Sequence, residues 1–296
     1  MTATAPAPMR IGRRRFDWGT RTYVMGILNV TPDSFSGDGL LAGGGSVAER
    51  IERAVRAARS MADAGADIVD VGGESTRPGH QPVDTGEEAD RVLPIVAAIR
   101  EALPELPISI DTTKPSVAEA ALAAGADLVN DVWGVAPDDS LALIAAARRV
   151  PIILMHNRAE PRYDDLVAEV IADLGEAIER TVQAGVEREL ILIDPGFGFG
   201  KTPIHNLEVL RNLGALRVLG RPILLGTSRK STLGKVLDVP ADERLEATLA
   251  TTTLGIAAGV DIVRVHDVQQ NVRVARMTDA VVRGWHPDDP PEGGSA

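Results

Sequence analysis

The stretch Ala64-Gly65-Ala66-Asp67-Ile68-Val69-Asp70-Val71 joins the end of an Ala-rich helical pattern to a short apolar run. Related segments recur at residues 124–127, 184–186 and 258–261. The first three glycines of the series are sixty residues apart, which matches two βα units of about thirty residues each. Because glycine commonly ends a helix in the left-handed conformation, each copy predicts a helix stop followed by a strand.

Eight such apolar runs occur along the chain, and nearly every one leads to a polar residue suited to binding a ligand. The runs cover residues 24–30, 68–71, 108–110, 128–130, 152–156, 190–194, 223–226 and 262–266. Helical patterns separate them at residues 47–64, 87–103, 116–124, 140–148, 165–184, 204–218, 244–258 and 270–282. This alternation predicts an α/β fold, a single-domain TIM (β/α)8 barrel whose chemistry lies at the carboxyl ends of the strands.

The composition agrees with one large domain and excludes several classes of function. With 44% hydrophobic but only 3% aromatic residues, the core must consist mainly of Val, Ile, Leu and Ala. The net charge of -11 argues against general nucleic-acid binding. No apolar stretch approaches the roughly 18 residues of a membrane span. The absence of cysteine excludes disulfides and fits a reducing, cytoplasmic location.

The two ends of the chain are predicted to be tails. Residues 1–20 begin with an Ala, Pro and Thr rich segment and continue with a basic one, so we expect a flexible N-terminal tail. A twin-arginine export signal is a poor fit, because polar residues interrupt the apolar segment that it requires. The barrel is predicted over residues 21–284, and residues 285–296, rich in Pro, Asp and Gly, are predicted to be disordered.

Two features invite interpretations that the sequence does not support. Gly196-Phe197-Gly198-Phe199-Gly200-Lys201-Thr202 is similar to a phosphate-binding loop, but Pro195 occupies the position of the first glycine of that motif. The five histidines show no paired spacing, so a zinc centre is not expected. Any metal is predicted to be Mg²⁺, held through oxygen ligands and substrate phosphates.

A series of motifs resembles the signatures of the dihydropteroate synthase family of pterin-binding enzymes. The first is Met25-Gly26-Ile27-Leu28-Asn29-Val30-Thr31-Pro32-Asp33-Ser34-Phe35-Ser36, and the second is Asp70-Val71-Gly72-Gly73-Glu74-Ser75-Thr76-Arg77-Pro78-Gly79. Further matches follow in the family's order at residues 110–112, 129–132, 155–156, 194–199, 228–230 and 264–267. They span nearly the whole chain, and together they are highly specific.

The resemblance implies that 6-hydroxymethyl-7,8-dihydropterin diphosphate is joined to p-aminobenzoate, which releases pyrophosphate and gives 7,8-dihydropteroate for folate biosynthesis. It implies a pterin site formed by Asp111, Asn130, Val132, Met155, Asp194, Phe199, Gly226 and Lys230. It implies a diphosphate site formed by Asn29, Thr76, Arg264 and His266, with Asn29 also a ligand of Mg²⁺. Asp33, Phe35, Thr76, Arg77, Pro78 and Ser231 are implied in the lid loops and the aminobenzoate site, where sulfonamides would compete. A homodimer is also implied.

The chemistry of these residue types suits that reaction. Carboxylate, amide and ammonium groups at strand ends can hold the polar edge of a pterin in one orientation. Arg264 and His266 are two residues apart on the last strand, so both point to the same face. Catalysis is assigned to Asp111, Lys230, Arg264 and His266, with Asp111 stabilising a cationic pterin methylene as pyrophosphate leaves.

Other interpretations stay open at this point. The strand-end carboxylates could merely cap helices, and Arg264 could form a structural salt bridge. The chain could also be an inactive pterin-binding paralogue or a pterin-dependent methyltransferase. Two departures from the family pattern, Asp38 displaced by one residue in the lid and Thr232 in place of an aromatic residue, concern the shape of the aminobenzoate pocket.

Overall fold

The structure is a computed structural model that describes residues 5–31, 46–74 and 83–284. Within these residues, eight parallel strands pair in the order β8-β7-β6-β5-β4-β3-β10-β9. A parallel bridge between Ile193 and Ile223 joins β8 to the start of β9 and closes the barrel. The strands are β3 (Tyr23–Asn29), β4 (Ile68–Gly72), β5 (Ile108–Asp111), β6 (Leu128–Asp131), β7 (Ile152–Met155), β8 (Ile191–Asp194), β9 (Leu224–Leu225) and β10 (Ile262–Val265). The predicted (β/α)8 barrel is confirmed.

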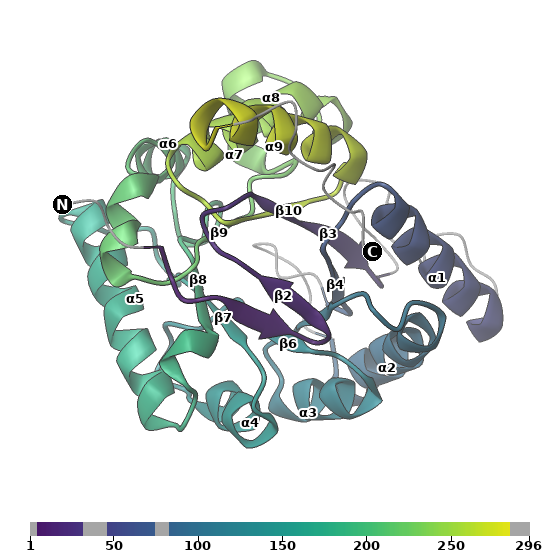
Figure 1. The fold of residues 1–296 in the computed structure, drawn as a ribbon. Coiled ribbons are helices and arrows are strands. Elements are labelled where there is room, and N and C mark those ends of the chain that lie inside the picture. Colours follow the sequence, from purple (N-terminus) through teal and green to yellow (C-terminus); the bar gives the residue numbers. More distant parts are fainter. Residues whose placement is uncertain (1–4, 32–45, 75–82, 285–296) are drawn as a thin grey trace.

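Helices surround the strands on the outside of the barrel (Figure 1). The predicted helices are α1 (Val47–Asp63), α2 (Thr85–Ala102), α3 (Pro115–Ala124), α4 (Ser140–Arg148), α5 (Leu166–Gln183), α6 (Pro203–Arg211), α8 (Leu245–Ala257) and α9 (Val268–Val282). The 3-10 helices are η1 (Arg188–Leu190), η2 (Leu213–Leu219) and η3 (Ala241–Glu243). None of the helices that the structure describes has the length and hydropathy of a membrane span.

The prediction of one helix over residues 204–218 is wrong, because α6 ends at Arg211 and η2 follows. The side-chain amide of Asn212 donates a hydrogen bond to the carbonyl of Glu208 at 2.8 Å, so it satisfies an acceptor at the end of the helix. The sequence prediction also missed α7 (Ser231–Leu237), which is too short to show a helical period.

The repeated helix stops are confirmed by the backbone. Gly65, Gly125, Gly185 and Gly259 all have positive φ values, between 96° and 117°. Each one ends or follows a helix on the outside of the barrel and turns the chain back toward the next strand. Because only glycine adopts this conformation without a steric cost, the spacing of these glycines sets the length of the units.

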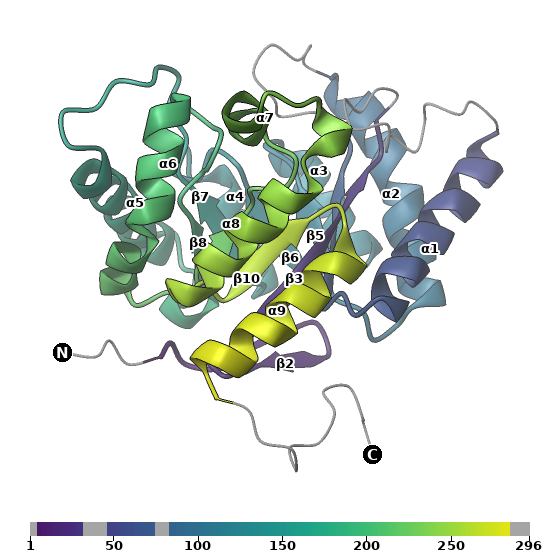
Figure 2. The same cartoon turned by 90° about the horizontal axis from the view of Figure 1, so that it is seen from above.

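The N-terminal segment is not the flexible tail that we predicted for residues 1–20. Strands β1 (Met9–Ile11) and β2 (Arg14–Phe16) form an antiparallel hairpin. The side chains of Met9, Ile11, Phe16 and Trp18 are buried against the lower inner residues of the barrel strands. Figure 2 shows β2 beneath the barrel, at the amino ends of the strands. The basic residues alternate with these apolar ones, and the apolar face closes the bottom of the barrel.

We expect Ile11→Ala to lower the free energy of unfolding by about 2–5 kcal/mol, because Ile11 is fully buried under the barrel. The kcat/KM should stay within twofold of the wild-type value, since the hairpin lies at the end of the barrel opposite the strand carboxyl ends. Urea unfolding and steady-state kinetics check both parts. Arg10→Ala, on the exposed face of the same strand, is the matched control. Equal unfolding curves for the two variants would refute the structural role of the hairpin.

Candidate active site

The register of the strands brings most of the predicted pterin-site residues to one face. In β4, β5 and β6 the paired positions are Gly72 with Asp111 and Asp111 with Asn130. In β7 and β8, Met155 pairs with Asp194. Because paired residues of parallel strands point to the same side of a sheet, these side chains share the inner face. Lower inner positions such as Met25, Ile68 and Leu128 belong to the apolar layer above the hairpin, so the polar layer lies at the carboxyl ends.

Arg264 of β10 lies between two inner carboxylates. Its Nε donates to Asp70 Oδ2 at 2.6 Å, and its Nη2 donates to Asp111 Oδ2 at 2.7 Å. Asn130 Nδ2 also donates to Asp70 Oδ2, at 3.2 Å. The other oxygens of the two carboxylates, Asp70 Oδ1 and Asp111 Oδ1, are buried and have no hydrogen-bond partner within the described residues. Two acceptors therefore remain open to the donors of a ligand.

Asp70 is a member of the candidate site that our sequence analysis did not assign. It stands inside the apolar run of β4 and is completely buried. A charged residue in the middle of a buried strand requires a counter-charge, and Arg264 supplies it. That requirement, together with the place of Asp70 at the start of the second family motif, is a sequence signal that could have identified it.

The environment of the buried acids disfavours their charged forms. Burial raises the pKa of Asp111 to about 7, and the neighbouring Asp70 and Glu88 add to the rise, while Arg264 and Lys230 oppose it. Burial also raises the pKa of Asp194, against the effects of Lys230 and of the hydrogen bond from the Gly196 N–H. The site thus contains one acid, Asp111, whose protonation can respond to a ligand near neutral pH.

The loop after β8 is wound so tightly that glycine is required at alternate positions. Gly196, Gly198 and Gly200 have φ values of 68°, 86° and 53°. A Cβ atom on Gly196 would lie 1.8 Å from the carbonyl oxygen of His156, and one on Gly200 would lie 2.4 Å from that of Arg158. The alternation of Gly and Phe that is similar to a phosphate-binding loop therefore serves a close approach of two backbone segments.

Lys230 faces this loop from the start of α7. Its Nζ donates to the carbonyl oxygen of Phe197 and lies 4.2 Å from the centre of the Phe199 ring. A cation over an aromatic face is attracted by the ring, so this contact orients both groups. Phe199 and Lys230, both predicted for the pterin site, are thus brought together.

Residues of two motifs that are distant in sequence contact one another beside the polar layer. The Ser228 hydroxyl and His266 Nδ1 are 2.9 Å apart, and the same hydroxyl oxygen accepts the His266 N–H at 3.2 Å. Arg229 donates to both oxygens of Asp267, at 3.0 and 2.6 Å. This bidentate pair links the loop after β9 to the loop after β10. It therefore restrains the backbone of the two segments that carry His266 and Lys230.

The sequence analysis also did not identify a charged cluster that lies beyond the carboxyl ends of β4 and β5. Lys114 forms ion pairs with Glu74 and with the fully buried Glu88. Glu74 Oε1 accepts the N–H of Val83 at 3.2 Å. The three charged residues come from three separate segments, so no local pattern in the sequence could have grouped them.

The remaining predicted residues are placed as follows. Val132 is buried just beyond β6, and its carbonyl accepts from Asn157 Nδ2 at 3.2 Å. Asn29 is the half-buried last residue of β3, and Ser231 is the exposed first residue of α7. Gly226 lies beside Arg264 and Asp194. Asp33, Phe35, Asp38, Thr76, Arg77 and Pro78 lie outside the described residues.

Thr232, one of the two departures from the family pattern, points into the protein rather than to the barrel mouth. It is buried, and its hydroxyl accepts from Asn206 Nδ2 at 2.9 Å. Asn206 Oδ1 in turn accepts the N–H of Gly198 at 2.7 Å. The threonine therefore supports the loop after β8 through α6.

Across residues 5–31, 46–74 and 83–284, no group of three or more His, Cys, Asp or Glu side chains could hold a metal ion. The side-chain oxygen of Asn29 suits a hard cation, but one neutral ligand does not form a cage. The donor set fits Mg²⁺ only if water and substrate oxygens complete the coordination.

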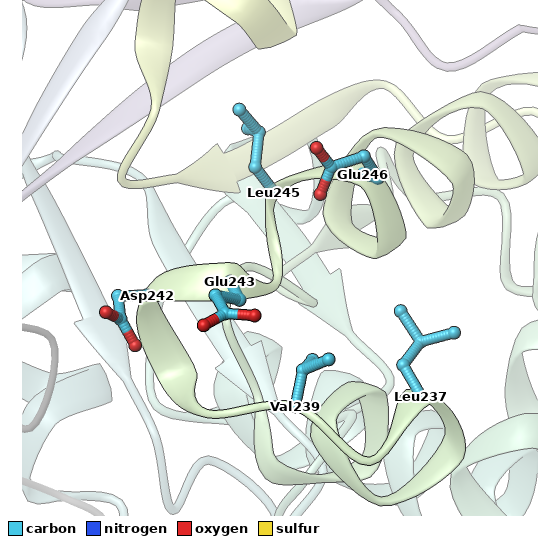
Figure 3. A pocket seen from close by; sticks show the side chains of 6 residues that line it. All are labelled: Leu237, Val239, Asp242, Glu243, Leu245 and Glu246. Carbon is cyan, nitrogen blue, oxygen red and sulfur yellow. The ribbon is translucent and has the colours of Figure 1, made fainter.

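A separate cavity of about 610 Å³ lies between the end of α7 and the start of α8. Figure 3 shows its lining of aliphatic and acidic side chains, Leu237, Val239, Asp242, Glu243, Leu245 and Glu246. None of the predicted site residues lines it, and its carboxylates would repel a diphosphate.

Comparisons with known proteins agree with the barrel. The model of the pterin-binding enzyme family matches residues 25–266. A dihydropteroate synthase of Clostridium beijerinckii is 51% identical over 276 residues, which cover 93% of this chain and 100% of the relative. The structure of a Clostridium difficile dihydropteroate synthase in the presence of pteroic acid has a TM-score of 0.85 at 51% identity, with 90% and 99% of the two chains covered. A Yersinia pestis dihydropteroate synthase in a sulfonamide drug complex has a TM-score of 0.86 at 36% identity, with 94% and 100% covered.

A barrel with this inner polar layer and these matches defines a class of enzyme, and the chain belongs to the pterin-binding enzyme family. Within the family, the chain is a dihydropteroate synthase.

Proposed function

We propose that the polar layer at the barrel mouth binds the pterin of 6-hydroxymethyl-7,8-dihydropterin diphosphate and directs the condensation with p-aminobenzoate. The observation that carries the assignment is the pair of buried acceptors without partners, Asp70 Oδ1 and Asp111 Oδ1, among the described residues. The ring edge of a pterin offers N–H donors to such acceptors. Asn130, Asp194 and Lys230 complete the set, and the pteroic acid in the C. difficile relative supports a ligand of this class.

We assign the stabilisation of the departing pyrophosphate to the cationic and polar groups at the same carboxyl ends of the strands. Arg264 uses two of its three nitrogens on Asp70 and Asp111. Its Nη1 has no partner within the described residues, so it can donate to the diphosphate as charge develops there. His266 is oriented by Ser228, and Thr76 belongs to the same proposed diphosphate site.

Asp111 is proposed to stabilise the positive charge that builds up on the pterin methylene as the carbon–oxygen bond to the diphosphate breaks. The arylamine of p-aminobenzoate is mostly unprotonated near pH 7, so it attacks the methylene carbon without a strong base. The carbon–oxygen bond breaks first and its electron pair leaves with pyrophosphate, the arylamine nitrogen then bonds to the methylene carbon, and that nitrogen loses a proton to solvent. Positioning and charge stabilisation therefore account for the rate.

Mg²⁺ is proposed as the metal of this reaction, with Asn29 as its protein ligand. When bound, it would neutralise charge on the diphosphate. Mg²⁺ keeps several waters in most of its sites and is commonly held by one or two protein oxygens together with substrate phosphates, so a single amide oxygen such as that of Asn29 suits this role.

The aminobenzoate is proposed to bind between the start of α7, at Ser231, and the loops that carry Asp33, Phe35, Thr76, Arg77 and Pro78. Sulfonamides are proposed to compete there, and the drug complex of the Y. pestis relative supports this. The enzyme is further proposed to act in the cytoplasm.

A homodimer is proposed through the helices away from the mouth. Leu254 on α8 is 56% exposed, and Met277 and Val281 on α9 are 66% and 71% exposed. Figure 2 shows these two helices side by side on one flank of the barrel. Apolar side chains grouped on one face support a contact with a second copy.

We expect pyrophosphate release by the purified protein to require the dihydropterin diphosphate, p-aminobenzoate and Mg²⁺ together. Chelation of Mg²⁺ should abolish turnover and re-addition should restore it, because the leaving group is otherwise not neutralised. A coupled pyrophosphate assay and detection of dihydropteroate check the expectation. Pterin binding without turnover would favour an inactive paralogue, and turnover in excess chelator would exclude the metal.

A further inference from the structure

Lys201 comes directly after the Gly196–Gly200 loop, and its side-chain amine lies close to that loop. Its Nζ lies 3.2 Å from the carbonyl oxygen of Gly196 and 3.1 Å from that of Phe199. It also lies 2.8 Å from Nδ1 of His156 and 3.4 Å from the carbonyl oxygen of the same residue. A single amine thus joins both ends of the loop to the residue that follows β7.

The partners of Lys201 are themselves held in place. The ring of His156 is fully buried, and its Nε2 lies 3.1 Å from Asp173 Oδ2 on α5. Arg158 donates to the same carboxylate oxygen from Nε at 3.0 Å and from Nη2 at 2.7 Å. Burial, and then the charge of Lys201, lower the pKa of His156 to about 4, so the ring is neutral near pH 7. Nδ1 then accepts from Lys201 while Nε2–H donates to Asp173.

The loop that Lys201 holds is the loop that orients Lys230. The carbonyl of Phe197 accepts the Lys230 amine, and the Phe199 ring lies against the same amine. Phe197 lies between the two carbonyls that Lys201 binds, and Phe199 provides one of them. A shift of either carbonyl would therefore move the acceptor and the ring that together fix the direction of the Lys230 side chain.

We propose that Lys201 is a positioning residue for the pterin site, acting through the Gly196–Gly200 loop on Phe199 and Lys230. The inference rests on the proposed role of these two residues in binding the pterin. Lys201 itself touches no substrate. Its amine adds contacts to the Gly196 and Phe199 carbonyls beside the loop's own hydrogen bond from the Phe199 N–H to the Gly196 carbonyl at 3.1 Å.

The electrostatic cost of placing an amine here argues that the contacts are needed. The pKa of Lys201 is lowered to about 7, chiefly by burial; Asp194 opposes the shift, and the nearby cations Lys230 and Arg158 contribute to it. A side chain that only filled space at this position would be apolar, because burying an amine beside two other cations is unfavourable. The acceptors that surround it compensate for that cost.

The test compares Lys201→Met with Lys235→Met, an exposed lysine on α7. We expect K201M to bind pteroic acid about tenfold more weakly or worse, measured by isothermal titration calorimetry, and to raise the KM for the dihydropterin diphosphate by a similar factor. At saturating pterin, kcat and the KM for p-aminobenzoate should change by less than about threefold. K235M should match the wild type in every measurement.

A purely structural role would lower the thermal midpoint without this selective loss of pterin affinity. A folded K201M with a pteroic acid Kd within twofold of wild type overturns the proposal. If K201M does not fold, Lys201→Gln, which keeps two donors but no charge, is measured by the same criteria, and an unchanged Kd again overturns it. The proposed function is tested separately by wild-type turnover, so failure of either idea can be recognised on its own.

Discussion

Arg264→Met should reduce kcat/KM by about a hundred- to a thousandfold. The same substitution should also destabilise the fold, and few other substitutions at the barrel mouth would have both effects. The guanidinium is proposed to stabilise the departing diphosphate, so its loss removes a donor at the developing charge. It is also the counter-charge of two buried acids, Asp70 and Asp111. Removing one partner from a buried ion pair costs about 3–5 kcal/mol. Steady-state kinetics and urea unfolding measure the two effects.

The destabilisation should depend on pH in a defined direction. Arg264 opposes the upward shift of the Asp111 pKa, so its removal lets that pKa rise beyond about 7. An acid whose folded pKa is raised contributes its stability at low pH and loses it as the pH rises from the unfolded value through the folded one. The difference in unfolding free energy between wild type and R264M should therefore be larger at pH 8 than at pH 5.

A second substitution separates charge from catalysis. In the double variant Arg264→Met/Asp111→Asn, one of the two uncompensated carboxylates is gone and only Asp70 remains, so stability at pH 8 should recover part of the loss while activity should not. Arg211→Met, at an exposed position of α6, is the control for a general effect of losing an arginine. Stability and kcat/KM of R264M within error of wild type would contradict both assigned roles.

The barrel could be predicted because its signals are local. Each strand is a run of β-branched and aliphatic residues between a helix stop and a polar residue, and the positive φ values of glycines such as Gly65 and Gly125 show why those stops recur. The positions of Asp111 and Asp194 at strand ends could be predicted for the same reason, and their roles in the site stay predictions. Their common orientation follows from strand register, which alternates with period two.

The rest depended on contacts between distant segments. The ion pairs of Lys114 with Glu74 and Glu88 join three elements, and the contacts of Lys201 join the loop after β8 to His156. Neither set of contacts produces a recognisable spacing of residues in the sequence. The hairpin over residues 9–16 was missed because two three-residue strands are too short to show alternation above the background of basic residues.

Lys230→Ala should abolish most pterin affinity with little effect on the fold. Lys230 is half-buried at the start of α7, and its amine is directed to the Phe197 carbonyl and the Phe199 ring rather than into the core. A charge-assisted hydrogen bond contributes about 1.5–3 kcal/mol, so the Kd for pteroic acid should rise about 10- to 100-fold. Isothermal titration calorimetry measures this change, and the thermal midpoint should stay close to that of the wild type.

The loss of pterin affinity in K230A should exceed the loss expected from a single hydrogen bond, because the charge of Lys230 also acts on the nearby acids. Its charge lowers the pKa of Asp194 and of Asp111, so K230A should shift both acids further toward their neutral forms. A neutral carboxyl is a poorer acceptor for pterin N–H groups, and because the pKa of Asp111 is about 7, the affinity of K230A should improve as the pH is raised from 6 to 8. Lys235→Ala, on the exposed face of the same helix, should show neither effect. If K230A binds pteroic acid within twofold of wild type at both pH values, the pterin must contact other residues, and the assignment of this rim as its site is wrong.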